Sequence, residues 1–185
     1  MVTARTDLVG AATLTDASLV RLVLDGRQEA FAELVRRHQD PLYRYACSLG
    51  VAPDAAQDLM QDAFVRAYQK LSQCRDPNRF RSWLLGILRN LVLDYGRDLR
   101  QTVSLEHVPE SGLAASPPQL ELRHALGTAL DRLPPLLREA FLLRHHQGYP
   151  YEEIAAITGA RVSAVKMRVH RAREQLQQAL AGVAM

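Results

Sequence analysis

The sequence predicts an all-α protein of two small helical domains joined by a flexible linker, with a helix-turn-helix in the C-terminal domain. Apolar residues recur with the 3.6-residue period of amphipathic helices through most of the chain. This period is lost over residues 101–122, where prolines, a glycine and small residues accumulate. Near the C-terminus, a Gly-Ala break at 159–160 separates two short helical runs. We therefore expect domains at 15–100 and 123–181, connected by a linker at 101–122.

Composition limits the class of protein. The chain has 185 residues, 48% of them hydrophobic, and a net charge of only +3, so a nucleic-acid surface would have to be local. No apolar run approaches the ~20 residues that span a bilayer, and the N-terminus lacks an export signal. Cys47 and Cys74 have neither zinc-site spacing nor a disulfide framework. We expect a reduced, cytoplasmic protein without membrane insertion, metal or cofactor.

The first two helices follow from turn residues and apolar spacing. Asp16 is expected to cap a short first helix. A second helix begins near Gln28 and is expected to break or restart at Asp40-Pro41, since proline lacks an amide N–H and disfavours helix at the residue before it. Gly50 is a natural stop for this helix.

The third helix opens at Pro53 and carries a polar, acidic ridge beside its apolar stripe. Asp58, Gln61 and Asp62 lie at positions i, i+3 and i+4, so they share one helix face. From the residues alone, a solvated face is the favoured interpretation and an interaction surface is the alternative.

A polar loop at residues 72–79 leads into a long fourth helix. Its arginines and Asn90 lie away from most of the apolar stripe. Asparagine is a poor helix former, so its presence at position 90 in mid-helix calls for an explanation. Its side-chain amide could form a hydrogen bond in the protein core, or it could be held ready to bond a DNA base, and the sequence favours neither. Asp94 is expected to pair with a neighbouring arginine. The expected buried stripe consists of Phe80, Trp83, Leu84, Ile87, Leu88, Leu91 and Tyr95.

Two further helices, at 124–133 and 136–146, precede the helix-turn-helix. Its second helix is expected to start at Ser163, with Val165, Val169, Ala172 and Leu176 on the buried face. The outward residues would then be Lys166, Met167, His170 and Arg171.

The charge of this segment points to a polyanion. Five basic residues occur without an acid among them, whereas a solvated helix face usually mixes signs. An amphipathic hairpin packed in an ordinary core is the alternative, but a DNA-reading helix is favoured. The five are Arg161, Lys166, Arg168, Arg171 and Arg173.

Five motifs, in order and at compatible distances over about residues 28–180, resemble the extracytoplasmic-function (ECF) group of bacterial RNA polymerase sigma factors, within the sigma-70 family. Each motif would be weak alone, and the ordered set carries the resemblance. The motifs read EAFAELVRRHQDPLYRYA, DAAQDLMQDAFVRAYQKL, FRSWLLGILRN with Asp94 after it, LPPLLREAFLLRHHQGYPYEEIA and VKMRVHRAR.

The resemblance implies a non-enzymatic factor that binds core RNA polymerase and directs promoter-specific initiation. It assigns the acidic ridge, Asp58, Gln61 and Asp62, to the polymerase β′ clamp, which reverses the preference for a merely solvated face. It assigns the second domain to the −35 element and the β flap. The implied −10 contacts are Cys74, Arg81, Arg89, Asn90 and Arg97, and the implied −35 contacts are Ser163, Lys166, Met167, His170 and Arg171.

The implied partners are core polymerase, double- and single-stranded promoter DNA, and an anti-sigma factor acting between the domains. The implied location is the cytoplasm, at the nucleoid when in holoenzyme. The sequence departs from the family pattern at Ser163-Ala164-Val165, where Gly-Thr-Val is common, and Ser163 can still cap the helix and bind phosphate. Met167 and His170 leave the preferred −35 sequence open.

Two other classes of function compete with this interpretation. A two-domain regulator with a C-terminal helix-turn-helix would bind duplex DNA unaided, but the N-terminal half lacks the alternating strands of a receiver. An enzyme is disfavoured because the chain has no glycine-rich phosphate loop and no recognisable nucleophile motif. His145 and His146 are adjacent on a helix, about 100° apart, and cannot easily share one metal.

Overall fold

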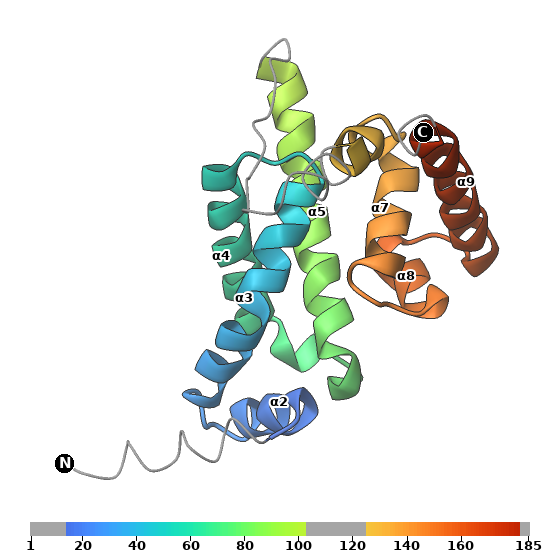
Figure 1. The fold of residues 1–185 in the computed structure, drawn as a ribbon. Coiled ribbons are helices and arrows are strands. Elements are labelled where there is room, and N and C mark those ends of the chain that lie inside the picture. Colours follow the sequence, from blue (N-terminus) through green and yellow to red (C-terminus); the bar gives the residue numbers. More distant parts are fainter. Residues whose placement is uncertain (1–13, 103–124, 182–185) are drawn as a thin grey trace, which may run out of the picture. The chain divides into compact units, whose positions relative to one another are not determined.

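The computed structural model describes residues 14–102 and 125–181, with the side chains of 99–102 left undescribed. Within these ranges the regular secondary structure is helical, without strands, and the all-α prediction is confirmed. The chain divides into two compact units, Met1–Glu106 and His107–Met185. Figure 1 shows the helices of each unit.

The first unit is built on three long helices that pack against one another, with a short helix across one end. Helices α3, α4 and α5 contact each other in pairs, and α2 packs on α3, on α5 and on the two 3₁₀ turns before α5 (Figure 1). Phe80, Leu84 and Leu88 are fully buried in this core. The elements are α2 (Asp16–Leu24), α3 (Ala30–Ser48), α4 (Pro53–Gln69), η1 (Leu71–Gln73), η2 (Pro77–Arg79) and α5 (Phe80–Thr102).

The cap of α2 differs from the prediction. Thr15 is the N-cap, and its side-chain oxygen accepts a hydrogen bond from the Ser18 amide at 3.2 Å. Asp16 is the first residue of the helix, and its carboxylate bonds to residues of α3 instead. The prediction that Asp16 caps the helix is therefore wrong, because a tertiary contact engages this side chain.

Helix α3 runs without a break through Pro41, so the predicted interruption at Asp40-Pro41 is also wrong. Side chains before and after the proline, among them Leu34, Leu42 and Tyr45, are buried on one helix face. A proline within a helix costs about 3 kcal/mol. Burial of several large apolar side chains, at ~1.5–3 kcal/mol each, outweighs that cost.

Helix α5 buries a face rotated from the predicted one. Leu85 and Val92 are buried, whereas Trp83, Ile87 and Tyr95 are only half-buried. The shift follows from the packing of α5 against α3 and α4 together, which centres its buried arc on Leu84, Leu88 and Leu91. The helix also continues to Thr102, two residues into the predicted linker; the rest of that linker lies outside the described residues.

The second unit contains the helix-turn-helix. Residues 125–131 are helical, and α7 (Pro135–His145) and α8 (Tyr151–Thr158) both pack on α9 (Val162–Leu180). One part of the core consists of Ala129, Leu133, Ala172 and Leu176.

The turn between α8 and α9 is made by Gly159 in the left-handed conformation, with φ +67°. Glycine reaches this conformation without a steric penalty, which allows the chain to reverse in a tight turn. Helix α9 begins at Val162 with Arg161 as N-cap, and no side chain caps it. The helix therefore begins one residue before the predicted Ser163, and the N-cap is Arg161, two residues before Ser163.

In the part of the chain that the structure describes, no helix combines the length and the apolar character needed to cross a bilayer.

Candidate nucleic-acid interface

Helix α9 separates its buried and exposed faces as the sequence predicted. Val165, Val169, Ala172 and Leu176 are buried. The opposite side of the helix is open to solvent, and Met167, an apolar residue, is 52% exposed there. The exposed residues include all five predicted −35 contacts: Ser163, Lys166, Met167, His170 and Arg171.

The crossing of α8 and α9 depends on small and apolar residues. Ala155 on α8 is buried, and Val165 on α9 is fully buried. Thr158 donates its hydroxyl proton to the Ile154 carbonyl at 2.7 Å, a local side-chain-to-backbone hydrogen bond in the last turn of α8. This packing fixes α9 on the unit with its polar face turned outward.

The exposed face of α9 is basic along its N-terminal half, and further along the helix it carries both positive and negative charges. Arg161, Lys166 and Arg171 are exposed and Arg168 is half-buried. His170 Nδ1 lies 3.6 Å from Glu174 Oε2, one helical turn on. The predicted one-sign run therefore ends at Glu174, and the strongest positive potential belongs to the first three turns of the helix.

Tyr151, the first residue of α8, has two basic side chains over its ring. The guanidinium carbon of Arg144, on α7, is 4.8 Å from the ring centroid, and Lys166 Nζ is 5.7 Å from it. Arg144 Nη1 also donates to the Tyr149 carbonyl at 3.1 Å. Both cations lie within the ~6 Å range of cation–π attraction. Sequence reasoning missed this cluster, because its three members come from three different helices.

In the first unit, the predicted −10 residues on α5 differ in exposure. Asn90 and Arg97 are exposed, while Arg81 and Arg89 are half-buried. Because Asn90 is exposed, the explanation of a core-bonded amide does not apply. Arg97 forms an ion pair with Asp94, which confirms the expected pairing of that aspartate.

Gly86 and the half-buried Trp83 and Ile87 lie on the same side of α5 as Asn90. A Cβ atom built on Gly86 would meet nothing within 4 Å. This side of the helix therefore offers apolar surface and open space next to the exposed amide of Asn90.

The loop before α5 is organised by Asp76. One carboxylate oxygen of Asp76 accepts hydrogen bonds from the backbone amide and the side chain of Asn78, each at 3.0 Å. The other lies 3.5 Å from Arg79 Nε. Arg75, Asn78 and Arg79 are exposed, so this turn presents polar and basic side chains to solvent.

Cys74 does not lie where a DNA contact requires it. Its side chain is buried, and its Sγ donates to the Asp76 carbonyl at 3.5 Å. Burial, with a smaller effect of the Asp76 charge, raises the pKa of the thiol. The assignment of Cys74 to DNA contact does not fit this position. Cys74 is a buried residue of the loop, and the exposed residues of the loop are its neighbours in sequence.

The acidic ridge of α4 is open to solvent. Asp58, Gln61 and Asp62 are all exposed on one side of the helix. Val65, one turn further along that side, is 55% exposed. Val65 and the three polar side chains thus form one continuous exposed strip on α4.

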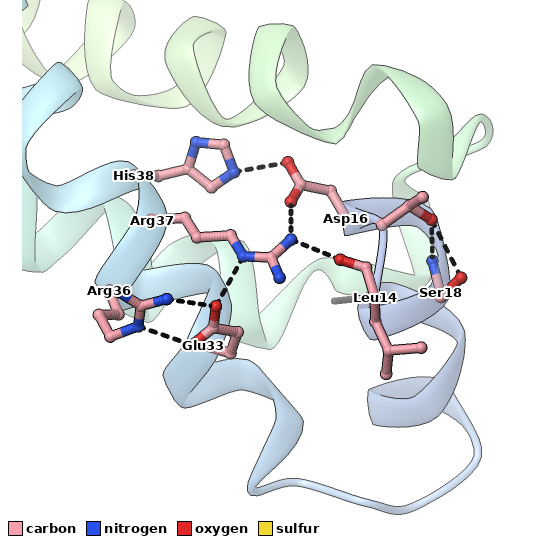
Figure 2. Close-up of polar contacts among 8 residues, drawn as sticks. Leu14, Asp16, Ser18, Glu33, Arg36, Arg37 and His38 are labelled. Atoms are coloured by element: carbon pink, nitrogen blue, oxygen red, sulfur yellow. Dashed lines mark hydrogen bonds and ion pairs between the residues drawn. The ribbon is translucent and has the colours of Figure 1, made fainter. Parts of the chain in front are cut away.

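A partly buried polar network joins α2 to α3 (Figure 2). Asp16 Oδ2 and His38 Nε2 are hydrogen-bonded at 2.7 Å. Arg37 Nη1 donates to Asp16 Oδ1 at 3.0 Å and to the Leu14 carbonyl at 2.7 Å. The His38 ring is buried, with its centroid 5.6 Å from that of Phe80 at the start of α5. The network therefore fixes α2 beside the loop that carries Arg75 and Arg79.

Glu33 completes this network on α3. Arg36 donates two hydrogen bonds to its carboxylate and Arg37 a third, each at 2.7 Å (Figure 2). These bonds, that of Arg36 first, lower the pKa of Glu33 to about 2. The hydrogen bond from His38 is the main cause that lowers the pKa of Asp16. Both carboxylates are thereby stabilised in the ionised form.

Comparison with known proteins accounts for both units. Residues 34–102 match the family Sigma-70 region 2, and residues 123–176 match Sigma-70, region 4. The chain is 39% identical over 158 residues to the ECF RNA polymerase sigma factor SigE of Mycolicibacterium smegmatis, covering 80% of this chain and 61% of the relative. It is 34% identical over 178 residues to the ECF RNA polymerase sigma-E factor of Escherichia coli, covering 88% of this chain and 93% of the relative.

Two solved structures share the fold. CnrH, solved in complex with the cytosolic domain of CnrY, has a TM-score of 0.68 at 33% identity, over 90% of this chain and 97% of that chain. The sigma factor RpoE from Bartonella quintana, solved with the anti-sigma factor NepR, has a TM-score of 0.68 at 30% identity. The match covers 82% of this chain and 96% of that chain. The resemblance predicted from the five motifs is thus confirmed. The chain belongs to the ECF group of RNA polymerase sigma factors, in the sigma-70 family.

Proposed function

We propose that this protein binds bacterial core RNA polymerase and directs initiation at promoters through two contacts. Helix α9 reads the −35 element as duplex, and α5 with the loop before it reads and opens the −10 element. The observation that carries this proposal is the exposed face of α9, where all five expected contact residues lie opposite a buried apolar face. Membership in the ECF family supports the same function.

At the −35 element, α9 enters the major groove. Arg171 and Lys166 are exposed and long enough to donate to the O6 and N7 acceptors of guanine, the commonest specific contact in that groove. Met167 offers apolar contact to a thymine methyl group. Ser163, in the first turn, donates to a backbone phosphate, where the N-terminal end of the helix dipole favours negative charge.

At the −10 element, Asn90 bonds the edge of an unpaired base, and Arg81, Arg89 and Arg97 neutralise phosphates. Extruding a base costs a few kcal/mol, which these contacts and those of the Asp76-organised loop offset. Cys74 is buried, so we assign it to the support of this loop and not to the contact.

Polymerase is bound through the α4 ridge, with Asp58, Gln61 and Asp62 facing the β′ clamp, while the second unit holds the β flap. CnrH and RpoE were each solved with the partner named above, and we propose that an anti-sigma factor binds this chain and holds it inactive. The protein then acts in the cytoplasm, joins the nucleoid as holoenzyme and has no catalytic activity of its own.

Reconstitution tests the proposal. Purified protein is mixed with sigma-free bacterial core polymerase and a library of promoter fragments, and transcript start sites are mapped. Initiation from a defined subset of templates is expected, and the absence of start-site selection on every template would contradict the proposal. A duplex-binding regulator would shift promoter DNA without polymerase in a gel, whereas this protein is expected to need polymerase.

A further inference from the structure

We propose that Tyr151 is a positioning residue for −35 recognition, whose ring holds the Lys166 side chain ready for DNA. This inference rests on the proposed function of α9. Three helices meet at the ring: Tyr151 begins α8, Arg144 belongs to α7 and Lys166 to α9. The distances to the ring centroid, 4.8 Å from Arg144 and 5.7 Å from Lys166, place both cations in its field.

The ring itself is held in place. Tyr151 is half-buried and follows Pro150, the N-cap of α8, whose backbone carbonyl accepts the amides of Glu153 at 3.1 Å and Ile154 at 3.0 Å. Ile154 is fully buried, which fixes α8 on the core. A fixed aromatic face can therefore orient a mobile side chain next to it.

The arrangement lowers the entropy that the Lys166 side chain would lose on binding DNA. Lys166 is exposed, and a long lysine side chain must lose part of its rotamer entropy when it contacts DNA. A ring that restricts the ammonium group before binding reduces that loss. Arg144 has less to gain, because one of its N–H groups already donates to the Tyr149 carbonyl.

The arrangement also concentrates positive charge. Both cations lie within ~6 Å of one ring centroid, at 4.8 and 5.7 Å. This raises the local positive potential at the edge of the DNA-reading face, and a phosphate backbone is the partner that best relieves it. Tyr151 thus influences recognition through Lys166 and needs no DNA contact of its own.

Double-mutant cycles in the reconstituted holoenzyme test this role. The ligand is a promoter fragment selected by the wild-type holoenzyme, and the readout is its dissociation constant. Tyr151→Leu is expected to weaken binding about two- to fivefold, which corresponds to an exposed cation–π contact. Tyr151→Phe retains the ring and is expected to bind within about twofold of the wild type.

The cycles separate positioning from a structural role. In a Lys166→Ala background, Tyr151→Leu should have no further effect, whereas in an Arg171→Ala background its effect should remain undiminished. Additive effects of Tyr151→Leu and Lys166→Ala would overturn the proposal, as would equal loss in the Phe and Leu variants. Thermal unfolding of each variant shows whether a loss of binding merely follows loss of folded protein. If Lys166→Ala weakens binding but Tyr151→Leu does not, the positioning role fails while the −35 contact of Lys166 stands; if Lys166→Ala leaves binding unchanged, both fail.

Discussion

At the residue scale, Arg171 gives the most direct test of −35 recognition. Its guanidinium group is exposed on the reading face of α9, and a bidentate contact to guanine is worth about 1–3 kcal/mol of discrimination. Arg171→Ala should therefore weaken promoter binding by about 1–3 kcal/mol and lower run-off transcription from −35-dependent promoters. Arg132→Ala removes the same charge from another exposed position of the second unit and should have little effect. Unchanged transcription in the Arg171 variant would remove this residue from the interface.

Asn90 tests the opening of DNA. Its exposed amide lies beside the open space at Gly86, and an unpaired base can use a hydrogen bond that a stacked base cannot reach. We expect Asn90→Ala to reduce permanganate reactivity of thymines in the −10 region while duplex binding by the holoenzyme persists. Gln39→Ala, at an exposed position of α3, is the control. Normal reactivity in the Asn90 variant would show that the amide has no part in opening.

At the scale of elements, the carboxylates that join α2 and α3 make stability sensitive to acid. The pKa of Glu33 is about 2 in the folded protein and 4.5 for the free group, and that of Asp16 is also lowered. Both groups therefore contribute stability that is fully present above about pH 4.5 and is lost as the pH falls towards 2. Chemical unfolding of the wild type should show a free energy of unfolding that decreases through this window.

Replacement of Glu33 isolates its part of that effect. Glu33→Gln keeps the shape of the side chain but removes the charge that Arg36 and Arg37 bind, and should cost about 1–3 kcal/mol near neutral pH. The variant should also lose part of the pH dependence below 4.5. Glu29→Gln, at an exposed position just before α3, is the matched control. If the two variants had equal stability profiles, the network would not stabilise the helix pair.

Helix α4 provides a second test at this scale. Reversing the charge of its ridge with Asp58→Lys and Asp62→Lys should abolish co-elution with core polymerase in gel filtration, since like charges then oppose each other at the interface. The matched control is Asp25→Lys with Asp40→Lys, which makes the same charge change at exposed positions outside the ridge. Continued co-elution of the ridge variant would place the polymerase contact elsewhere.

At the scale of the whole molecule, the sequence predicted features that depend on residues close together in the chain better than features that depend on packing between helices. The buried face of α9 follows from a period of 3.6 that only one set of apolar residues satisfies, and the turn follows from Gly159. The face of α5 was predicted less well, because apolar residues such as Trp83 and Leu85 occur on both sides of it. The helices that pack against α5 therefore determine which of its apolar residues are buried.

The periodicity of apolar residues could not predict contacts between segments that are distant in the sequence. The hydrogen bond from His38 to Asp16 spans 22 residues, and the ring contacts of Tyr151 join three helices. The cap at Thr15 and the continuous helix at Pro41 likewise reflect tertiary packing that outweighs local preference. The boundaries of the predicted domains remain predictions, and the experiments above test the assignment of individual contact residues.

The burial of Cys74 has a practical consequence for following the protein in action. A thiol buried within the loop, with its pKa raised, should react slowly with disulfide reagents, while the half-buried Cys47 reacts sooner. Any movement of the loop that uncovers Cys74 would therefore register as faster labelling. The native chain thus contains its own chemical probe, which allows the timing of loop movement to be compared with that of strand separation.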